Sequence, residues 1–102
     1  MKYQFVLQWD AASISDFDSL MEAEEFLSEN LSELHMVDGH DMGCGEFNIF
    51  VLTDAPKTAF SEIKDLWRVQ ENLASARIAY RKVLTDTFVV LWPHDLSEFK
   101  IA

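Results

Sequence analysis

The chain has 102 residues, 49% of them hydrophobic, and carries a formal net charge of −10. This length fits one domain over residues 1–102 with a modest core and leaves no room for a second domain. It contains no apolar run near the roughly 20 residues that cross a bilayer, and the residues after Met1 turn polar too early for a secretory signal. The single cysteine excludes an internal disulfide framework, so we expect a cytoplasmic protein.

The acidic residues are concentrated in the first half of the chain. Residues 1–54 contain twelve Asp and Glu against one Lys, whereas residues 55–102 contain six acidic and seven basic residues. Such a field repels nucleic acid and anionic lipid and attracts a basic protein partner. High net charge also keeps a small domain soluble.

Two elements are predicted before the middle of the chain. Apolar and polar residues alternate from Lys2 to Trp9, which is the period of a half-buried strand. Ser13 or Ser15 then caps a helix that ends near Asn30 or Ser32. Its polar side carries Glu22, Glu25 and Glu29, and its apolar side faces a core.

The middle of the chain predicts a hairpin and a second helix. Leu34 to Asp38 and Glu46 to Thr53 are typical of two strands, joined by a long glycine-containing connection. Asp54 is the predicted cap of the second helix, with Pro56 in its first turn. The predicted core stripe of this helix is Ala59, Phe60, Ile63, Leu66, Trp67 and Leu73.

Two further strands, Ala76 to Val83 and Thr87 to Trp92, complete the order βαββαββ. This order predicts an α+β fold with a ferredoxin-like antiparallel sheet, βαββαβ plus one extra C-terminal strand, and two helices on one face. The other face is expected to be open and, by analogy with such domains, covered by a second subunit, which predicts a homodimer. The side chains expected on it are Gln4, Gln8, Glu46, Asn48, Arg77 and Arg81.

All three glycines fall within seven residues of the predicted connection, together with the only cysteine. Glycine permits positive φ and close backbone approach, so this concentration indicates a tightly specified turn. We interpret this loop as the candidate binding site, formed by Asp38, Gly39, His40, Asp41, Gly43, Cys44, Gly45, Glu46 and Asn48.

The stretch VDGHDMGCGEFNIF over residues 37–50, followed by Thr53-Asp54-Ala55-Pro56, resembles a group of small uncharacterised bacterial proteins with a ferredoxin-like fold. The resemblance implies the fold and a special status for the loop. It implies no catalytic residue for this chain.

Three functional hypotheses follow. The first is a non-enzymatic, inhibitor- or immunity-like binding module that recognises a protein partner through the loop and the acidic helix, without a cofactor. The second is a small enzyme or metal-dependent sensor at His40, Asp41, Cys44 and Glu46, with His35 nearby, although the spacing of a structural zinc site is missing. The third is a regulatory or structural dimer that uses the open sheet face.

Overall fold

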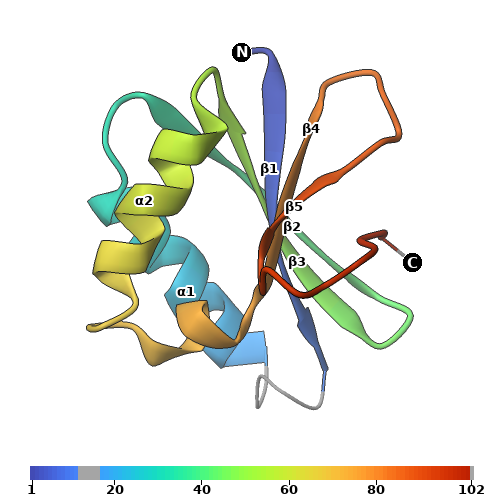
Figure 1. Cartoon of the computed structure of the whole chain (residues 1–102). Helices are drawn as coiled ribbons and strands as arrows, with labels where there is room; N and C mark the ends of the chain where they lie inside the picture. Colours follow the sequence, from blue (N-terminus) through green and yellow to red (C-terminus); the bar gives the residue numbers. More distant parts are fainter. Residues whose placement is uncertain (12–16, 102) are drawn as a thin grey trace.

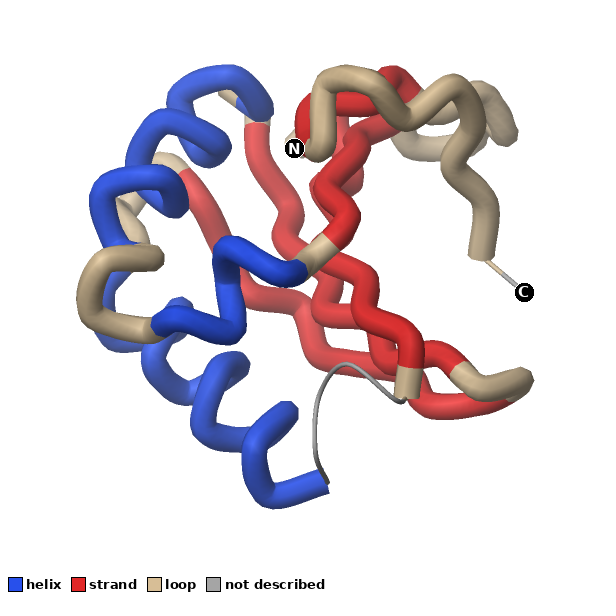
Figure 2. The backbone as a smooth tube through the Cα atoms, turned by 60° about the horizontal axis from the view of Figure 1, so that its bottom comes forward, coloured by secondary structure: helices blue, strands red, loops and turns tan. Residues whose placement is uncertain are grey.

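The computed structural model describes residues 1–11 and 17–101 and consists of helices on one side of a sheet and an irregular C-terminal segment on the other (Figures 1 and 2). The predicted α+β class is confirmed. The predicted caps Ser13 and Ser15 lie outside the described residues. In chain order the elements are β1 (Tyr3–Asp10), α1 (Phe17–Asn30), β2 (His35–Gly43), β3 (Glu46–Thr53), α2 (Pro56–Leu66), the 3₁₀-helix η1 (Glu71–Ser75), β4 (Arg77–Lys82) and β5 (Val89–Trp92).

The sheet has five strands in the order β2-β3-β1-β4-β5, and each neighbouring pair is antiparallel. Strand β1 lies at the centre, where Gln8 is paired with Asn48 of β3 on one side and with Arg77 of β4 on the other. Paired residues of neighbouring strands point to the same face, so the sheet register decides which side chains meet.

The face toward the helices carries the main core (Figure 1). Phe5, Leu7 and Trp9 alternate along β1 and are fully buried. They pack in one cluster with apolar residues of both helices, such as Leu27 of α1 and Ile63 of α2. Leu73 joins this cluster from η1 rather than from α2, which ends at Leu66.

The opposite face was expected to be open, but part of it is covered. Val6 and Ala79 of the sheet pack there against Phe99, which is only 8% exposed and comes from the segment after β5. Gln8 and Asn48 do share this face, as predicted, but they are 2% and 1% exposed. The C-terminal segment therefore covers part of the surface that the sequence had assigned to a second subunit.

The connection between β2 and β3 is also shorter than predicted. Strand β2 continues to Gly43, which is paired with Glu46, so only Cys44 and Gly45 form the turn. Both turn residues have positive φ, 53° for Cys44 and 77° for Gly45, as a type I′ hairpin turn requires. Most of the candidate loop is thus strand.

Helix α2 begins without the predicted aspartate cap. Ala55 occupies the cap position and makes no side-chain capping bond, and Pro56 follows in the first turn. Asp54 Oδ1 instead accepts a hydrogen bond from the backbone N–H of Lys2 at 2.8 Å. In the described part of the chain, the helices are too short and too polar for any of them to span a membrane.

Candidate functional site

The candidate loop contains a bulge in strand β2. Val37 is paired with Val51 and His40 with Ile49, so Asp38 and Gly39 together face the single residue Phe50. Gly39 has φ of 108°, which explains a glycine at this position. An added Cβ would meet nothing within 4 Å at Gly39, so the requirement is for backbone conformation and not for space.

His40 directly follows the bulge and faces helix α1. Its Nδ1 lies 3.1 Å from Glu24 Oε2, and its ring contacts the edge of Phe17 with 6.0 Å between centroids. The His40 side chain keeps 31% of its exposure and Glu24 keeps 20%, so this contact lies near the surface. It connects the hairpin to the acidic helix.

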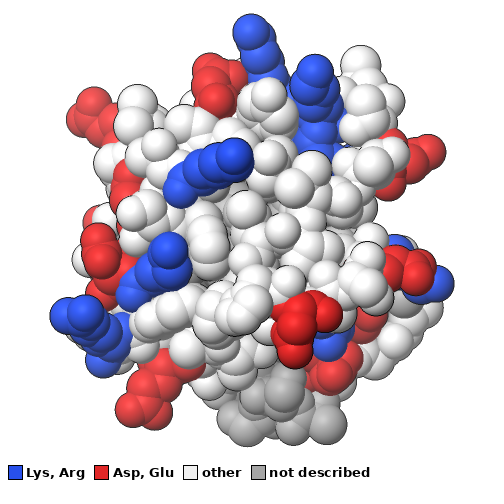
Figure 3. All heavy atoms as spheres, in the orientation of Figure 1, with Lys and Arg blue, Asp and Glu red and all other residues white. Residues whose placement is uncertain are grey.

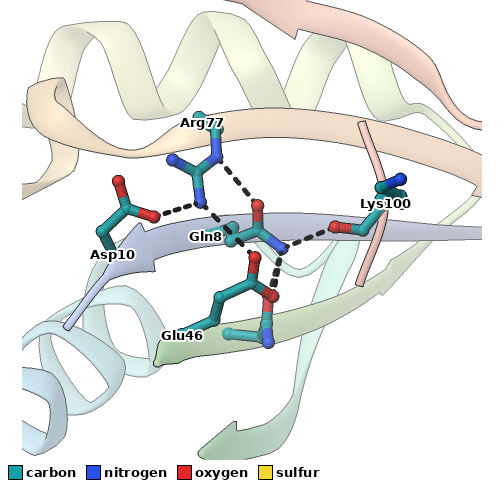
Figure 4. A network of polar contacts seen from close by, with 6 residues as sticks. Gln8, Asp10, Glu46, Arg77 and Lys100 are labelled. Atoms are coloured by element: carbon teal, nitrogen blue, oxygen red, sulfur yellow. Dashed lines mark hydrogen bonds and ion pairs between the residues drawn. The ribbon is translucent and has the colours of Figure 1, made fainter. Parts of the chain in front are cut away.

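Glu46 and Asn48 point to the opposite face of the sheet and meet Gln8 there (Figure 4). Gln8 Nε2 lies 3.2 Å from Glu46 Oε1, 3.0 Å from Asn48 Oδ1 and 3.1 Å from the carbonyl oxygen of Lys100. Gln8 Oε1 accepts from Arg77 Nε at 2.8 Å. Because Arg77 can only donate, this bond fixes which end of the Gln8 amide faces which neighbour. The amide thereby connects three strands and the C-terminal segment.

Arg77 extends this network to the surface. Its Nη2 lies 3.0 Å from Asp10 Oδ1 and 3.8 Å from Glu46 Oε2. The hydrogen bond from Arg77 and its positive charge lower the pKa of the Asp10 carboxyl below its ordinary value. The network, which we call the Gln8 network, consists of Gln8, Asp10, Glu46, Asn48, Arg77 and the Lys100 carbonyl.

His35 belongs to a separate buried group on the helix side. Its side chain is fully buried, with Nδ1 2.7 Å from Thr53 Oγ1 and Nε2 3.0 Å from Glu62 Oε2. Thr53 Oγ1 already accepts from the N–H of Ala55 at 2.9 Å, so its own proton is free to point to Nδ1. A proton on Nε2 can then be donated to Glu62 Oε2, so both ring nitrogens have a partner. Thr53 is fully buried as well, so this group connects β2, β3 and α2 and offers no accessible nucleophile.

Glu62 completes this group at the surface. Its burial alone would raise the pKa of the carboxyl, but the hydrogen bonds from the Ser32 N–H, the Ser32 hydroxyl and His35 outweigh burial and lower it. Ser32 N and Oγ lie 2.8 and 2.9 Å from the two carboxylate oxygens. The ionised form of Glu62 therefore stabilises the turn between α1 and β2.

The four residues of the enzyme or metal-sensor hypothesis are not brought together. His40 contacts α1 on one face of the sheet, whereas Glu46 contacts Arg77 on the other face. Asp41 is paired with Asn48, and Cys44 is a free, exposed thiol at the turn. Within residues 1–11 and 17–101, His, Cys, Asp and Glu form no group of three or more that could hold a metal ion.

Sequence reasoning did not single out Thr53 and Glu62. They lie 18 and 27 residues from His35, and neither forms a motif with it in the sequence. The role of the Lys100 carbonyl had no signal either, because backbone groups carry no side-chain identity. The alternation along β1 and β4 correctly predicted that Gln8 and Arg77 lie on the same face of the sheet, but it did not predict that this face is covered there.

Surface charge is mixed on the side of the molecule drawn in Figure 3, where Lys and Arg side chains stand among Asp and Glu. The first half of the chain therefore does not make this whole side acidic. In comparisons with known protein families, curated proteins and solved structures, nothing matched this chain.

Proposed function

We propose that this chain is a small binding module, not an enzyme, whose recognition surface is formed by helix α1 and the β2–β3 hairpin. The observation that carries the proposal is the contact of His40 with Glu24 and Phe17, because it joins the candidate loop to the acidic helix. Two features of sequence that were singled out separately thus become neighbours on one surface.

This surface combines exposed apolar side chains with carboxylates. Phe17 is 45% exposed and Met42 is 44% exposed, and Met42 points to the same side of β2 as His40. Aromatic residues and Met are enriched at protein interfaces, where they supply the buried centre of the contact. The carboxylates of α1 would then form the rim, with Glu22, Glu25 and Glu29 exposed to solvent.

The partner that fits this surface is a basic protein. Carboxylates arranged on a rigid helix attract such a partner and raise its association rate, most strongly at low salt. Inhibitor and immunity-type proteins that capture a basic nuclease or toxin are a class that uses acidity in this way. A reducing, cytoplasmic location belongs to the same proposal and is supported by the single free cysteine.

The experiment is a charge reversal with a matched control. The partner is first captured from a lysate with the wild-type protein, and its association rate is then measured against the triple variant Glu22→Lys, Glu25→Lys, Glu29→Lys. The control carries Asp65→Lys, Glu71→Lys and Asp95→Lys, which change the net charge equally at exposed positions in the second half of the chain.

We expect the helix variant to associate at least about tenfold more slowly than the control at low salt, and the difference to shrink as salt is added. Equal rates for the two variants would contradict recognition by α1. If the helix variant associates slowly but the double variant His40→Ala, Met42→Ala associates at the wild-type rate, the recognition surface includes the helix and not the hairpin.

We also propose that the arrangement of strands and helices is the ferredoxin-like layout with an added fifth strand. It is supported by the position of β1 and β3 at the centre of the first four strands and by the two helices on one face (Figure 1). An experimental structure that places α1 and α2 on opposite faces would refute it.

The homodimer stays a prediction and now concerns a smaller area. The C-terminal segment lies over Gln8, but Met36 of β2 is 48% exposed on the same face of the sheet. Sedimentation equilibrium of the wild-type protein and of Met36→Glu measures how far each one dimerises. We expect the variant to be the more dissociated, and a wild-type protein that stays monomeric would remove the dimer from the proposal.

A further inference from the structure

The end of the sheet farthest from the hairpin turn carries a hollow with a basic rim. The hollow measures about 390 Å³ and is lined by Tyr3, Tyr80, Arg81, Lys82, Thr85, Thr87 and Val89. The rings of Tyr3 and Tyr80 stand edge to face, 5.7 Å apart, and form its aromatic wall. A second hollow of about 320 Å³ is also lined by the two tyrosines, together with Lys57 and Asp54.

This end of the molecule is locally positive, although the chain as a whole is strongly acidic. Lys2, Lys57, Arg81 and Lys82 lie here, four of the eight basic residues of the chain. Figure 3 shows Lys and Arg side chains gathered around the end where the N-terminus lies in Figure 1. The acidic neighbours are Asp54, which accepts from the backbone of Lys2, and Asp86.

The lysines beside the tyrosines have no ion-pair partner in the part of the chain that the structure describes. Arg81 is occupied, because Nε donates to Gln4 Oε1 at 2.9 Å and its guanidinium also contacts the carbonyl of Thr85. Lys57 and Lys82, by contrast, form no ion pair within residues 1–11 and 17–101. Their charge is therefore available to a ligand.

The loop that borders the hollow has a constrained shape. Leu84 has φ of 74°, a conformation that is unfavourable for a bulky side chain, and it is 96% exposed. The N–H and the hydroxyl of Thr85 both donate to the carbonyl of Lys82, at 3.1 and 2.8 Å, which holds the loop against the strand. Residues held in such sparsely populated backbone conformations cluster at ligand-binding and switch regions.

We propose that this hollow binds a small organic anion, with a flat apolar body against Tyr3 and Tyr80 and a phosphate or carboxylate group beside Lys82. An aromatic wall with a few convergent polar groups is the usual composition of a small-molecule site. The cationic rim selects for an anion, since the rest of the chain would repel one. The site is at the other end of the sheet from the proposed recognition surface and does not depend on it.

The test is an NMR titration of the full chain, labelled with ¹⁵N, with phenyl phosphate and with benzoate. We expect saturable shifts confined to residues 2–3, 54–58 and 80–89 for at least one of the two anions, and the better binder identifies the acidic group. Phenol and inorganic phosphate, which each lack one half of the ligand, should bind at least tenfold more weakly. The absence of saturable shifts with both anions would overturn the proposal.

Lys82→Gln is the test of the rim and Lys64→Gln is its control. Lys64 also lies over an aromatic ring, 4.7 Å from the centroid of Phe60, but lies outside the hollow. We expect Lys82→Gln to weaken the anion about five- to tenfold and Lys64→Gln to leave it unchanged. Equal effects would overturn the site, and if Lys82→Gln did not fold, Lys57→Gln would serve in its place with a smaller expected loss.

Discussion

Each face of the sheet has a buried centre, but different elements cover the two centres. Toward the helices, the main buried cluster is apolar, and the buried polar residues His35 and Thr53 bond to each other beside it. On the other face, Gln8 and Asn48 are buried beside Val6, Ala79 and Phe99. A helix satisfies its own backbone groups, so it can cover apolar residues alone. The C-terminal segment forms no helix in the residues described up to 101, and the carbonyl of Lys100 accepts a hydrogen bond from Gln8 of the sheet. The buried amide of Gln8 thus provides a partner for the segment that covers the second face.

The largest effect is expected on the helix face. Leu7→Ala should destabilise the protein by about 2–5 kcal/mol, because it removes a fully buried side chain and leaves a cavity. Val6→Ala, one residue earlier and on the other face, should cost about 1–2 kcal/mol, because it removes fewer atoms beneath a thinner cover. Denaturant unfolding measures both. Equal losses would mean that the C-terminal segment packs as firmly as the helices do.

The second largest effect is expected in the Gln8 network. Gln8→Ala leaves Arg77 Nε, Asn48 and the Lys100 carbonyl without their shared partner, which should cost about 1–3 kcal/mol. Gln4→Ala is the matched control, since Gln4 also accepts from an arginine Nε but is partly exposed. If the control loses as much stability as Gln8→Ala, then the buried amide has no special role.

A smaller effect concerns pH and the group around Glu62. The folded state lowers the pKa of this carboxyl, so its contribution to stability is complete above about pH 4.3, the ordinary value, and is lost as pH falls through the lower folded value. Glu62→Gln should therefore have a lower free energy of unfolding than the wild type near pH 7. On acidification, that free energy should fall less steeply in the variant than in the wild type. Asp10→Asn, on the second face, should flatten the curve separately, and additive effects would show that the two groups titrate independently.

The smallest effect is expected at the hairpin turn, outside both buried faces. Cys44 has φ of 53°, and asparagine tolerates this left-handed conformation better than other non-glycine residues. Cys44→Asn should stabilise the protein by up to about 1 kcal/mol and leave the amide spectrum of both faces unchanged. A loss of stability would show that the thiol makes a contact worth more than the backbone strain.

Sequence periodicity predicted the structure well in segments where apolar and polar residues alternate, and poorly in segments without such a period. The alternation along β1 predicted a strand with two different faces and placed Gln8 on the face away from the helices, and the structure confirms both, with Phe5 and Leu7 buried toward the helices. The segment after β5 has no period, so nothing in its sequence showed that Phe99 would cover Val6.

The candidate loop shows the other reason for a wrong prediction. One extra residue in a strand looks the same in sequence as the start of a loop, and the glycine at the Asp38–Gly39 bulge was therefore interpreted as part of a long connection. His40 and Glu46 were grouped by proximity along the chain, but the pleat directs them to opposite faces.

The bulge at Asp38 and Gly39 also affects how the protein behaves in concentrated solution. Strand β2 lies at the edge of the sheet, where a regular strand would present an unbroken row of N–H and C=O groups to a neighbouring molecule. The bulge interrupts that row near its middle, and Asp38 within the bulge and Asp41 after it add negative charge to this edge. Deleting Gly39 would leave His40 opposite Ile49 and both halves of β2 on their present faces, but it would restore a continuous edge. The shortened chain would keep its fold and acquire a tendency to polymerise by sheet extension.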